Sequence, residues 1–269
     1  MFSNYSYNSG GEKMDLRLKF NEDEVNYDRF RPTYVTEMFN DIINYSELNS
    51  GKKALEIGIG TGQATLPILK TGCEVTAIEL GENLAQYVKQ KFLDFSNFEV
   101  KNLEFESFIT ENNQYDVIYS ATAFHWIPQD LGLTKVYNLL KPGGTIALFW
   151  NHPFVNREDD AVHREIRKAY AKYRPSGKSP TEFDGSTCKQ YADILSSYGF
   201  TDVRTKPYHQ SRELNSHDYV SLLNTYSDHR ALQSDVKNGL ENEIVQAIDK
   251  FGGKIIIYDT IDLYLGKKI

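Results

Sequence analysis

The stretch Ala54-Leu55-Glu56-Ile57-Gly58-Ile59-Gly60-Thr61-Gly62 decides the fold that we expect for this chain. It begins with an apolar run of the length of a short strand, after which glycine stands at every second position. Glycine lets the backbone turn sharply and lets a ligand approach the main chain closely. Helical spacing follows over Gln63–Lys70. The stretch therefore predicts a strand, a ligand-binding turn and a helix.

The spacing of the glycines separates this turn from two common phosphate-binding turns. A dinucleotide fingerprint would need glycine where Gln63 stands, and the Gly-Lys-Ser/Thr of a nucleoside triphosphate loop is absent. Glu56, just before the glycines, would repel a pyrophosphate, whereas it would attract an ammonium group. These features disfavour an NAD-dependent oxidoreductase and a triphosphate-binding protein.

Outward from this turn, strands and helices are expected to alternate. Such alternation implies βαβ units and hence a parallel sheet with helices on both faces. The expected strands are Ala54–Gly58, Glu74–Leu80, Phe98–Lys101, Tyr115–Ser120 and Thr145–Trp150, and the expected helices are Thr33–Leu48, Gln63–Lys70, Glu82–Leu93 and Gln129–Leu140.

After Asn151 the rhythm changes. Four further helices and two further strands are predicted from apolar spacing and from breaks at glycine and proline. The helices are Arg157–Lys172, Lys189–Tyr198, Asp218–Tyr226 and Leu240–Phe251, and the strands are Val203–Tyr208 and Lys254–Tyr258, the second with a continuation over Asp259–Leu265.

The composition is that of an ordinary globular protein. The chain has 269 residues, a formal net charge of −7, and no apolar run long enough for a membrane span or a signal peptide, so we expect a cytoplasmic protein without membrane contact. An acidic chain without a Lys/Arg run is a poor partner for nucleic acid. Cys73 and Cys188 form no CxxC pair, and the histidines show no paired ligand spacing, so no metal site is expected.

Glu79 ends the second predicted strand, about 20 residues beyond the glycines. At that place an acidic side chain can bind both hydroxyls of a ribose. The alternative for a single acid at a strand end is a solvated loop carboxylate. The register with the glycine turn favours the ribose.

Five segments in the right order give the chain a family likeness. They are Leu55–Gly62, Ala77–Leu80, Val100–Glu104, Tyr115–Trp126 and Leu139–Ala147. With them the chain resembles the class I S-adenosylmethionine-dependent methyltransferases, in particular the bacterial small-molecule type. The likeness is strong over residues 50–150, moderate over 25–50 through Tyr27–Pro32, and weak after 155.

The resemblance implies a fold and a division of the chain. The expected fold is α/β, with a Rossmann-like, seven-stranded, mostly parallel sheet whose last strand is antiparallel. Residues 1–269 would form a single methyltransferase domain. Within it, residues 1–32 would lie over the cofactor, and an insertion at about 152–200 would form a helical cover over the active site.

The resemblance also implies the cofactor, S-adenosylmethionine, and the residues that bind it. Glu56 and the glycine turn would hold the methionine half, Glu79 the ribose and Leu80 the adenine. Relatives often have Asp in place of Asn102, whose amide oxygen can still accept a hydrogen bond from adenine. The full predicted set is Tyr27, Glu56, Gly58, Gly60, Gly62, Gln63, Glu79, Leu80, Asn102, Leu103, Ser120 and Ala121.

Residues for the acceptor molecule are harder to assign. His125 follows the fourth strand, where it could act as a base, orient the substrate or simply pack in the loop. Trp126 beside it is a candidate wall of the substrate site. Arg31 could pair with a carboxylate, and Asn151-His152 faces the expected pocket after the fifth strand.

The function expected from the sequence is methyl transfer to a small molecule, with a carboxylate as one option. The Asn/Asp-Pro-Pro-Tyr/Phe motif of amino-methylating nucleic acid enzymes is absent where Ser120-Ala121-Thr122-Ala123 stands. A methyltransferase fold that binds the cofactor without catalysis is the alternative. The oligomeric state and the methylated atom do not follow from the sequence.

Overall fold

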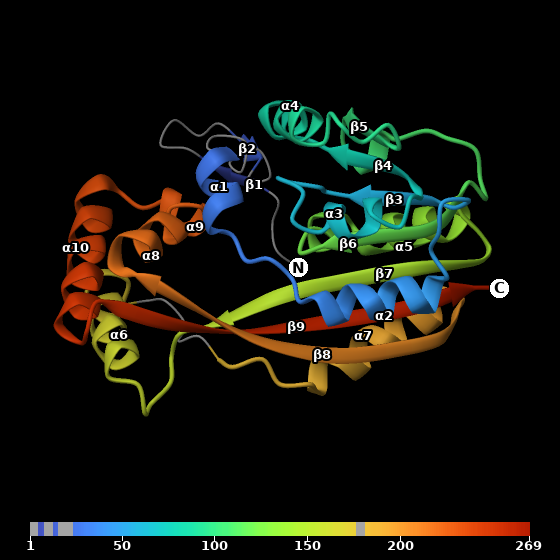
Figure 1. The fold of residues 1–269 in the computed structure, drawn as a ribbon. Helices are drawn as coiled ribbons and strands as arrows, with labels where there is room; N and C mark the ends of the chain where they lie inside the picture. The colour runs from blue at the N-terminus through green and yellow to red at the C-terminus, as the bar shows by residue number, and fades with distance from the viewer. Residues whose placement is uncertain (1–4, 8–12, 16–23, 176–180) are drawn as a thin grey trace.

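The computed structural model of the chain describes residues 5–7, 13–15, 24–175 and 181–269. Its main element is a seven-stranded sheet of order β5-β4-β3-β6-β7-β9-β8 (Figure 1). The strands are β3 (Lys53–Ile57), β4 (Glu74–Glu79), β5 (Phe98–Asn102), β6 (Tyr115–Ala121), β7 (Leu140–Phe154), β8 (Phe200–Asn215) and β9 (Lys254–Lys268). β9 runs antiparallel to both its neighbours, and the other pairs are parallel. The predicted fold class is confirmed.

Helices cover both faces of this sheet. α2 (Thr36–Ser46), α3 (Thr65–Leu69) and α4 (Glu82–Lys91) pack on one face, and α5 (Gln129–Leu139) and α7 (Ser186–Ser197) pack on the other. Successive side chains of a strand point to opposite faces. In β3, Ala54 accordingly belongs to the first core and Leu55 to the second. Because both faces are covered, the strand is buried at every position after Lys53.

A third core lies beyond the parallel part of the sheet. There β9 and the adjoining parts of β7 and β8 carry α6 (Ala161–Tyr173), α8 (Ser216–Leu223), α9 (Ser227–Arg230) and α10 (Ser234–Lys250). Ile255 and Ile257 of β9 pack there with Phe30 from α1 (Glu24–Phe30). Figure 1 shows these helices gathered at one end of the molecule, which we name the helical lobe.

Several elements differ from the sequence-based expectation. β7 and β8 are far longer than Thr145–Trp150 and Val203–Tyr208, and α1 was not predicted. β8 is an edge strand whose outward positions are polar, so apolar spacing marks little of it. The helix expected over Asp218–Tyr226 corresponds to α8, which ends at Leu223, and α9 follows beyond the expected range. The remaining strands β1 (Tyr5–Tyr7) and β2 (Lys13–Asp15) form a separate antiparallel pair.

Candidate functional site

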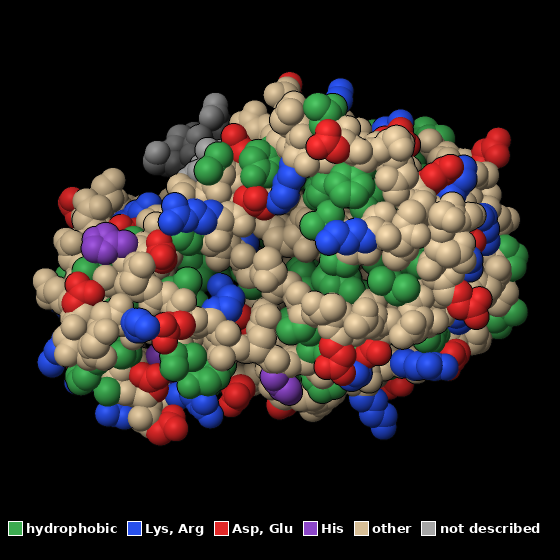
Figure 2. Space-filling model, in the orientation of Figure 1, with side chains coloured by type: hydrophobic (Ala, Val, Ile, Leu, Met, Phe, Trp, Pro, Cys, Tyr) green, Lys and Arg blue, Asp and Glu red, His purple; other side chains and the backbone are tan. Residues whose placement is uncertain are grey.

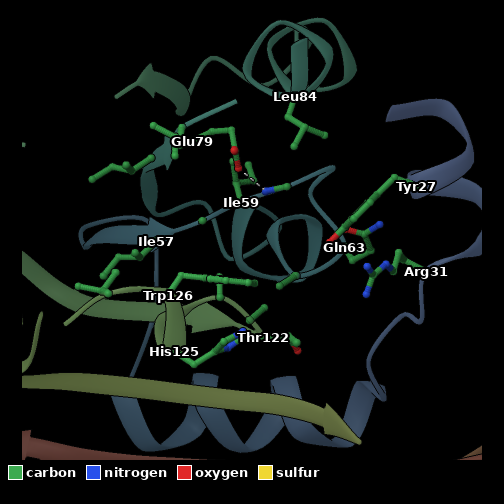
Figure 3. Close-up of a pocket in the computed structure, with 18 of the residues that line it drawn as sticks. Tyr27, Arg31, Ile57, Ile59, Gln63, Glu79, Leu84, Thr122, His125 and Trp126 are labelled. Atoms are coloured by element: carbon green, nitrogen blue, oxygen red, sulfur yellow. Dashed lines mark hydrogen bonds between the residues drawn. The ribbon is translucent and has the colours of Figure 1, made fainter. Parts of the chain in front are cut away.

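A cavity of about 290 Å³ opens at the carboxyl ends of the parallel strands (Figure 3). This edge is where open α/β sheets bind their ligands. The lining residues used below come from the glycine turn, the ends of β4, β6 and β7, the segment after β5, the segment from residue 27 to the start of α2, and the start of α9. They are Tyr27, Arg31, Tyr34, Gly58, Gly60, Gln63, Glu79, Leu80, Leu103, Glu104, Phe105, Glu106, Ala121, Thr122, His125, Trp126, Asn151, Pro153, Tyr226 and Asp228.

The glycine turn forms one wall of the cavity. Gly58, Gly60 and Gly62 all have positive φ, between 58° and 81°. A Cβ on Gly58 would stand 2.6 Å from Ala123, and one on Gly62 would stand 2.5 Å from the Phe92 ring. Gly58 and Gly60 line the cavity, whereas Gly62 packs away from it against Phe92. The turn thus presents bare backbone to a ligand on one side and fits a tight core on the other.

Glu79 stands at the end of β4 with its carboxylate against the glycine turn. One oxygen accepts a hydrogen bond from Gly60 N and the other from Gly81 N, both at 2.8 Å. Burial raises the pKa of this carboxyl, while these backbone N–H groups act in the opposite direction. Glu79 lines the cavity, so it can still accept further hydrogen bonds there.

Glu56 is more deeply placed than the sequence suggested. Its side chain is 1% exposed, and it lies outside the described lining of the cavity. One oxygen, Oε2, accepts hydrogen bonds from Thr65 Oγ1 at 2.7 Å and from Tyr119 OH at 2.8 Å. The other oxygen is buried without a partner in the structure. Burial raises the pKa of Glu56 to about 7.

Of the residues predicted on the adenine side, some line the cavity and others support its wall. Leu80 and Leu103 line the cavity. Asn102 instead donates hydrogen bonds from Nδ2 to the carbonyl oxygens of Glu79 and Leu80, at 2.9 and 3.0 Å. It therefore fixes the turn that carries Glu79 rather than standing in the cavity. Ser120, which is buried, donates to the carbonyl of Ile57.

The segment 27–32 reaches the cavity from the side of the helical lobe. Tyr27 and Arg31 line it, together with Gln63 from the glycine turn. The Arg31 guanidinium lies between two rings, 4.7 Å from the Tyr27 centroid and 4.3 Å from that of Tyr226. It also donates to the carbonyl of Thr225 at 2.8 Å. Arg31 thereby connects the N-terminal segment to the lobe.

The loop after β6 lies beside the glycine turn and supplies another part of the cavity wall. His125 and Trp126, in the short 3₁₀ helix η3 (Phe124–Trp126), both line the cavity. Thr122, in the left-handed region at φ 53°, bonds through Oγ1 with Tyr34 OH and accepts from Asn151 N. Thr122 and Tyr34 were not expected from the sequence, because backbone strain and long-range packing leave no local pattern.

His152 lies outside the described lining of the cavity. Asn151 and Pro153 line the cavity, and since strand residues alternate in direction, the side chain of His152 points to the other face. There its ring stacks on Phe183 with centroids 4.1 Å apart, and Nε2 contacts Asp262 Oδ1 at 2.9 Å. This arrangement does not favour the predicted substrate contact of His152.

From the sequence we expected no metal site, no membrane span, and a helical cover formed by residues at about 152–200. Within the described residues, no group of three or more metal-ligating side chains occurs, and no helix is long and apolar enough to cross a membrane. Of the residues in that range, Pro153 belongs to the described lining of the cavity. Tyr226 and Asp228, which follow that range in the chain, also line the cavity. The division of the domain, including the part of segment 1–32 outside the described residues, stays a prediction.

Comparison with known sequences gives a consistent set of relatives. A sequence model of the methyltransferase domain matches residues 54–144. Two proteins of Schizosaccharomyces pombe, one described as an uncharacterized methyltransferase-like protein and the other as an uncharacterized methyltransferase, are each 24% identical to this chain. The first alignment spans 87% of this chain and 86% of the relative, and the second spans 85% and 86%.

Solved structures share the fold. A putative type II methyltransferase from Anaeromyxobacter dehalogenans superposes with a TM-score of 0.64 at 20% identity, covering 88% of this chain and 98% of that one. Phosphoethanolamine N-methyltransferase 2 of Haemonchus contortus, solved with phosphomonomethylethanolamine and S-adenosylhomocysteine, gives 0.56 at 14% identity and covers 95% and 60%. At these identities the likeness extends to the architecture alone.

Proposed function

Because this chain is a class I S-adenosylmethionine-dependent methyltransferase, we propose that it methylates a small-molecule carboxylate in the cavity described above. The observation that carries the proposal is that one cavity is lined both by the glycine turn with Glu79 and by Thr122, His125 and Tyr226. We name the part beside the glycine turn and Glu79 the first chamber, and the part beside Thr122, His125 and Tyr226 the second chamber. A cofactor and a small acceptor would therefore meet without leaving the protein.

The residues of the first chamber fit the cofactor. We place the adenine between Leu80, Leu103 and Phe105, the ribose hydroxyls on Glu79, and the methionine end near Gly58 and Tyr27. The unpartnered oxygen of Glu56, behind the turn, suits a positive charge held directly or through a water molecule.

The charge of the cavity also suits a cationic cofactor. Four carboxylates, Glu79, Glu104, Glu106 and Asp228, belong to the described lining, together with one guanidinium, that of Arg31. A cleft with an excess of one sign of charge concentrates ligands of the opposite sign.

The protein has little covalent chemistry to perform. When bound, S-adenosylmethionine supplies an electrophilic methyl group whose carbon–sulfur bond breaks with the electron pair staying on sulfur, giving a neutral thioether. The task of the surrounding residues is to hold the acceptor in line and to exclude water. Tyr34, Trp126 and Tyr226 are suited to this task as aromatic walls of the second chamber.

A carboxylate acceptor is favoured by the charges of the second chamber. The Arg31 guanidinium lies 4.3 Å from the ring centroid of Tyr226, and Asp228 is paired with Arg174 at 2.9 Å, which offsets its negative charge. The other carboxylates stand at the ends of β4 and β5, on the cofactor side. An ionised carboxylate needs no base, since it has no proton to lose. On the face in Figure 2, Lys and Arg are interspersed with Asp and Glu, which supports a small acceptor over nucleic acid.

Calorimetry and a turnover assay test this proposal together. We expect S-adenosylhomocysteine to bind, and we expect labelled methyl groups to pass from S-adenosylmethionine to at least one acid in a panel of small mono-, di- and tricarboxylates. Binding without transfer to any acid, amine, thiol or phenol would support a cofactor-binding protein instead. Absence of binding would overturn both.

Replacing Glu79 with Ala tests the ribose assignment. The variant should bind S-adenosylhomocysteine roughly 5- to 150-fold more weakly, because a hydrogen bond to a charged group contributes roughly 1.5–3 kcal/mol and a neutral one about 1 kcal/mol. Calorimetry of the folded variant measures this change. Glu99→Gln removes an exposed carboxylate of the neighbouring strand and should leave the affinity as it is. An unchanged affinity in Glu79→Ala would refute the assignment.

A further inference from the structure

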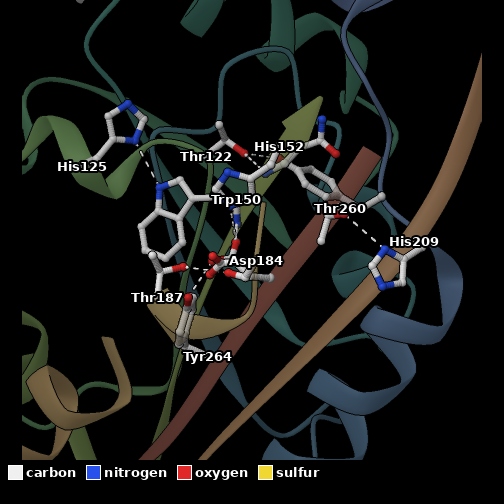
Figure 4. Close-up of polar contacts among 12 residues, drawn as sticks. Thr122, His125, Trp150, His152, Asp184, Thr187, His209, Thr260 and Tyr264 are labelled. Atoms are coloured by element: carbon white, nitrogen blue, oxygen red, sulfur yellow. Dashed lines mark hydrogen bonds and ion pairs between the residues drawn. The ribbon is translucent and has the colours of Figure 1, made fainter. Parts of the chain in front are cut away.

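His125, which lines the cavity, meets Trp150, which lies outside the described lining. The indole nitrogen of Trp150, in β7, lies 3.1 Å from Nδ1 of His125 in η3 (Figure 4). No other hydrogen bond of the His125 ring is recorded among the described residues. Figure 4 shows the second ring nitrogen pointing away from the indole. Since His125 lines the cavity, this second nitrogen is the one available to a ligand.

The chemistry of the two rings fixes where the proton is. An indole N–H is a donor and never an acceptor, so Nδ1 of His125 must accept with its lone pair. In a neutral imidazole the proton then resides on Nε2. Protonating Nδ1 as well would bring two N–H groups face to face. Burial lowers the pKa of His125 to about 4, which also keeps the ring neutral at pH 7.

Trp150 is itself held firmly. Its ring makes edge contacts with Tyr191 of α7 and Tyr264 of β9, at 5.0 and 5.7 Å between centroids, and its backbone N–H donates to Asp262. The titratable groups around it bond to one another: Asp262 accepts from Tyr264 OH and contacts His152 Nε2.

Arg31, Glu104, Glu106 and Asp228 line the same cavity as His125. Beside α7, Asp184 accepts a hydrogen bond from Ser186 N. Desolvation lowers the pKa of His125, and the hydrogen bond from Trp150 selects the tautomer.

We propose that Trp150 is a positioning residue that holds His125 as an Nε2–H donor, and that this donor binds an oxygen of the acceptor molecule instead of acting as a base. The proposal rests on the proposed function and narrows it. Without a base at this position, an acidic acceptor must arrive already ionised, as a carboxylate does at neutral pH with its pKa near 4. One carboxylate oxygen would accept from Nε2–H while the other faces the methyl group.

The tautomer can be measured without knowing the acceptor. In histidine labelled with nitrogen-15, long-range proton–nitrogen spectra of the full chain with S-adenosylhomocysteine distinguish the protonated from the unprotonated ring nitrogen, and His125→Gln assigns the signal. We expect Nδ1 to be unprotonated and the ring to stay neutral down to about pH 5. Trp150→Phe should mix the tautomers and raise the pKa. A proton on Nδ1, or no effect of Trp150→Phe, would overturn the positioning role.

The donor role is tested with succinate and citrate as probes on the protein loaded with S-adenosylhomocysteine. His125→Asn, which keeps a polar group near Nδ1 only, should weaken probe binding about 10-fold or more. His125→Gln, whose amide N–H reaches towards the position of Nε2, should restore part of it. His209→Gln is the matched control, since His209 is exposed on β8 and bonds to Thr260.

The outcomes separate the two proposals. Equal losses in the Gln and Asn variants, or no probe binding to the wild type, would overturn the donor role. Loss of S-adenosylhomocysteine binding in the wild type would count against the proposed function instead.

Discussion

Glu56 is a buried carboxyl group beneath the glycine turn. Thr65 and Tyr119 satisfy one of its oxygens, and the other has no partner among the described residues. Burial raises the pKa of Glu56 from 4.5 to about 7, with Glu79 adding a smaller repulsive contribution. A cofactor ammonium near this oxygen would favour the ionised form of Glu56, which burial alone disfavours. Glu56 thus links cofactor binding, proton binding and stability at a single residue.

The pH dependence of stability follows from this shift. Between about pH 4.5 and 7 the folded protein keeps the proton of Glu56 while the unfolded chain has lost it. The free energy of unfolding should therefore fall by roughly 3 kcal/mol as the pH rises through this interval, at about 1.4 kcal/mol per pK unit, and stay level above it. Urea denaturation of the cofactor-free protein, compared with Glu56→Gln, measures this contribution.

Glu56→Gln should be as stable as the wild type near pH 5 and more stable at pH 8, while binding S-adenosylhomocysteine more weakly. Glu74→Gln, at an exposed carboxylate on β4, serves as the control and should show neither change. A wild-type stability that stays parallel to that of Glu56→Gln from pH 5 to 8 would show that Glu56 does not titrate in this interval.

At the scale of the element, the turn from β3 to α3 is held by packing as well as by backbone conformation. Gly62 has φ 81°, and a Cβ there would collide with Phe92, which is itself packed against Phe95 and Phe98. Gly60 has φ 58°, but its nearest neighbour, Tyr27, would stand 3.7 Å from a Cβ. The two glycines share a conformation and differ in the space around them.

This difference predicts unequal effects of the same substitution. Gly60→Ala should lower the free energy of unfolding by about 1 kcal/mol, the approximate cost of a left-handed alanine. Gly62→Ala should lower the free energy of unfolding by roughly 2–4 kcal/mol, because overpacking against the Phe92 ring adds about 1–3 kcal/mol to the conformational cost. Chemical denaturation measures both variants. Equal losses would mean that Phe92 moves aside and that conformation alone requires glycine at 62.

Local patterns found most of the elements and missed some of their limits. The strands around the glycine turn have apolar side chains towards both faces, so their bounds follow closely from the sequence. β8 pairs along its whole length with β9, from Phe200 with Lys268 to Asn215 with Lys254. That pairing comes from a partner distant in sequence, and the polar outward face of β8 carries no local signal for it.

At the scale of the whole molecule, the cavity lies where the parallel sheet meets the helical lobe. α1 spans the two parts, as Figure 1 shows. Asp28 accepts hydrogen bonds from Tyr87 OH and Lys91 Nζ of α4, at 2.8 and 2.6 Å, and Arg31 bonds to Thr225 beside the lobe. Tyr27 of the same helix lines the cavity. A ligand in the cavity would therefore stabilise contacts on both sides of α1.

Hydrogen exchange followed by mass spectrometry should detect this coupling. With saturating S-adenosylhomocysteine, exchange in Glu24–Phe30 should slow markedly, because opening α1 would expose the ligand and lose its binding free energy. The peptide covering α10, which packs in the lobe away from the cavity, should change much less. Equal protection of α1 and α10 would indicate a general stabilisation and would contradict a specific role for α1.

The sequence by itself determined the order of the elements, the parallel sheet, the glycine turn with Glu79, and the family. These depend on apolar periodicity and on residues close together in the chain. Only the tertiary structure decided that Glu56 lies behind the cavity, that Asn102 supports the turn, that His152 points to the opposite face, and that Trp150 meets His125. Each of these depends on long-range packing or on the direction of a side chain, and neither property is written in local sequence.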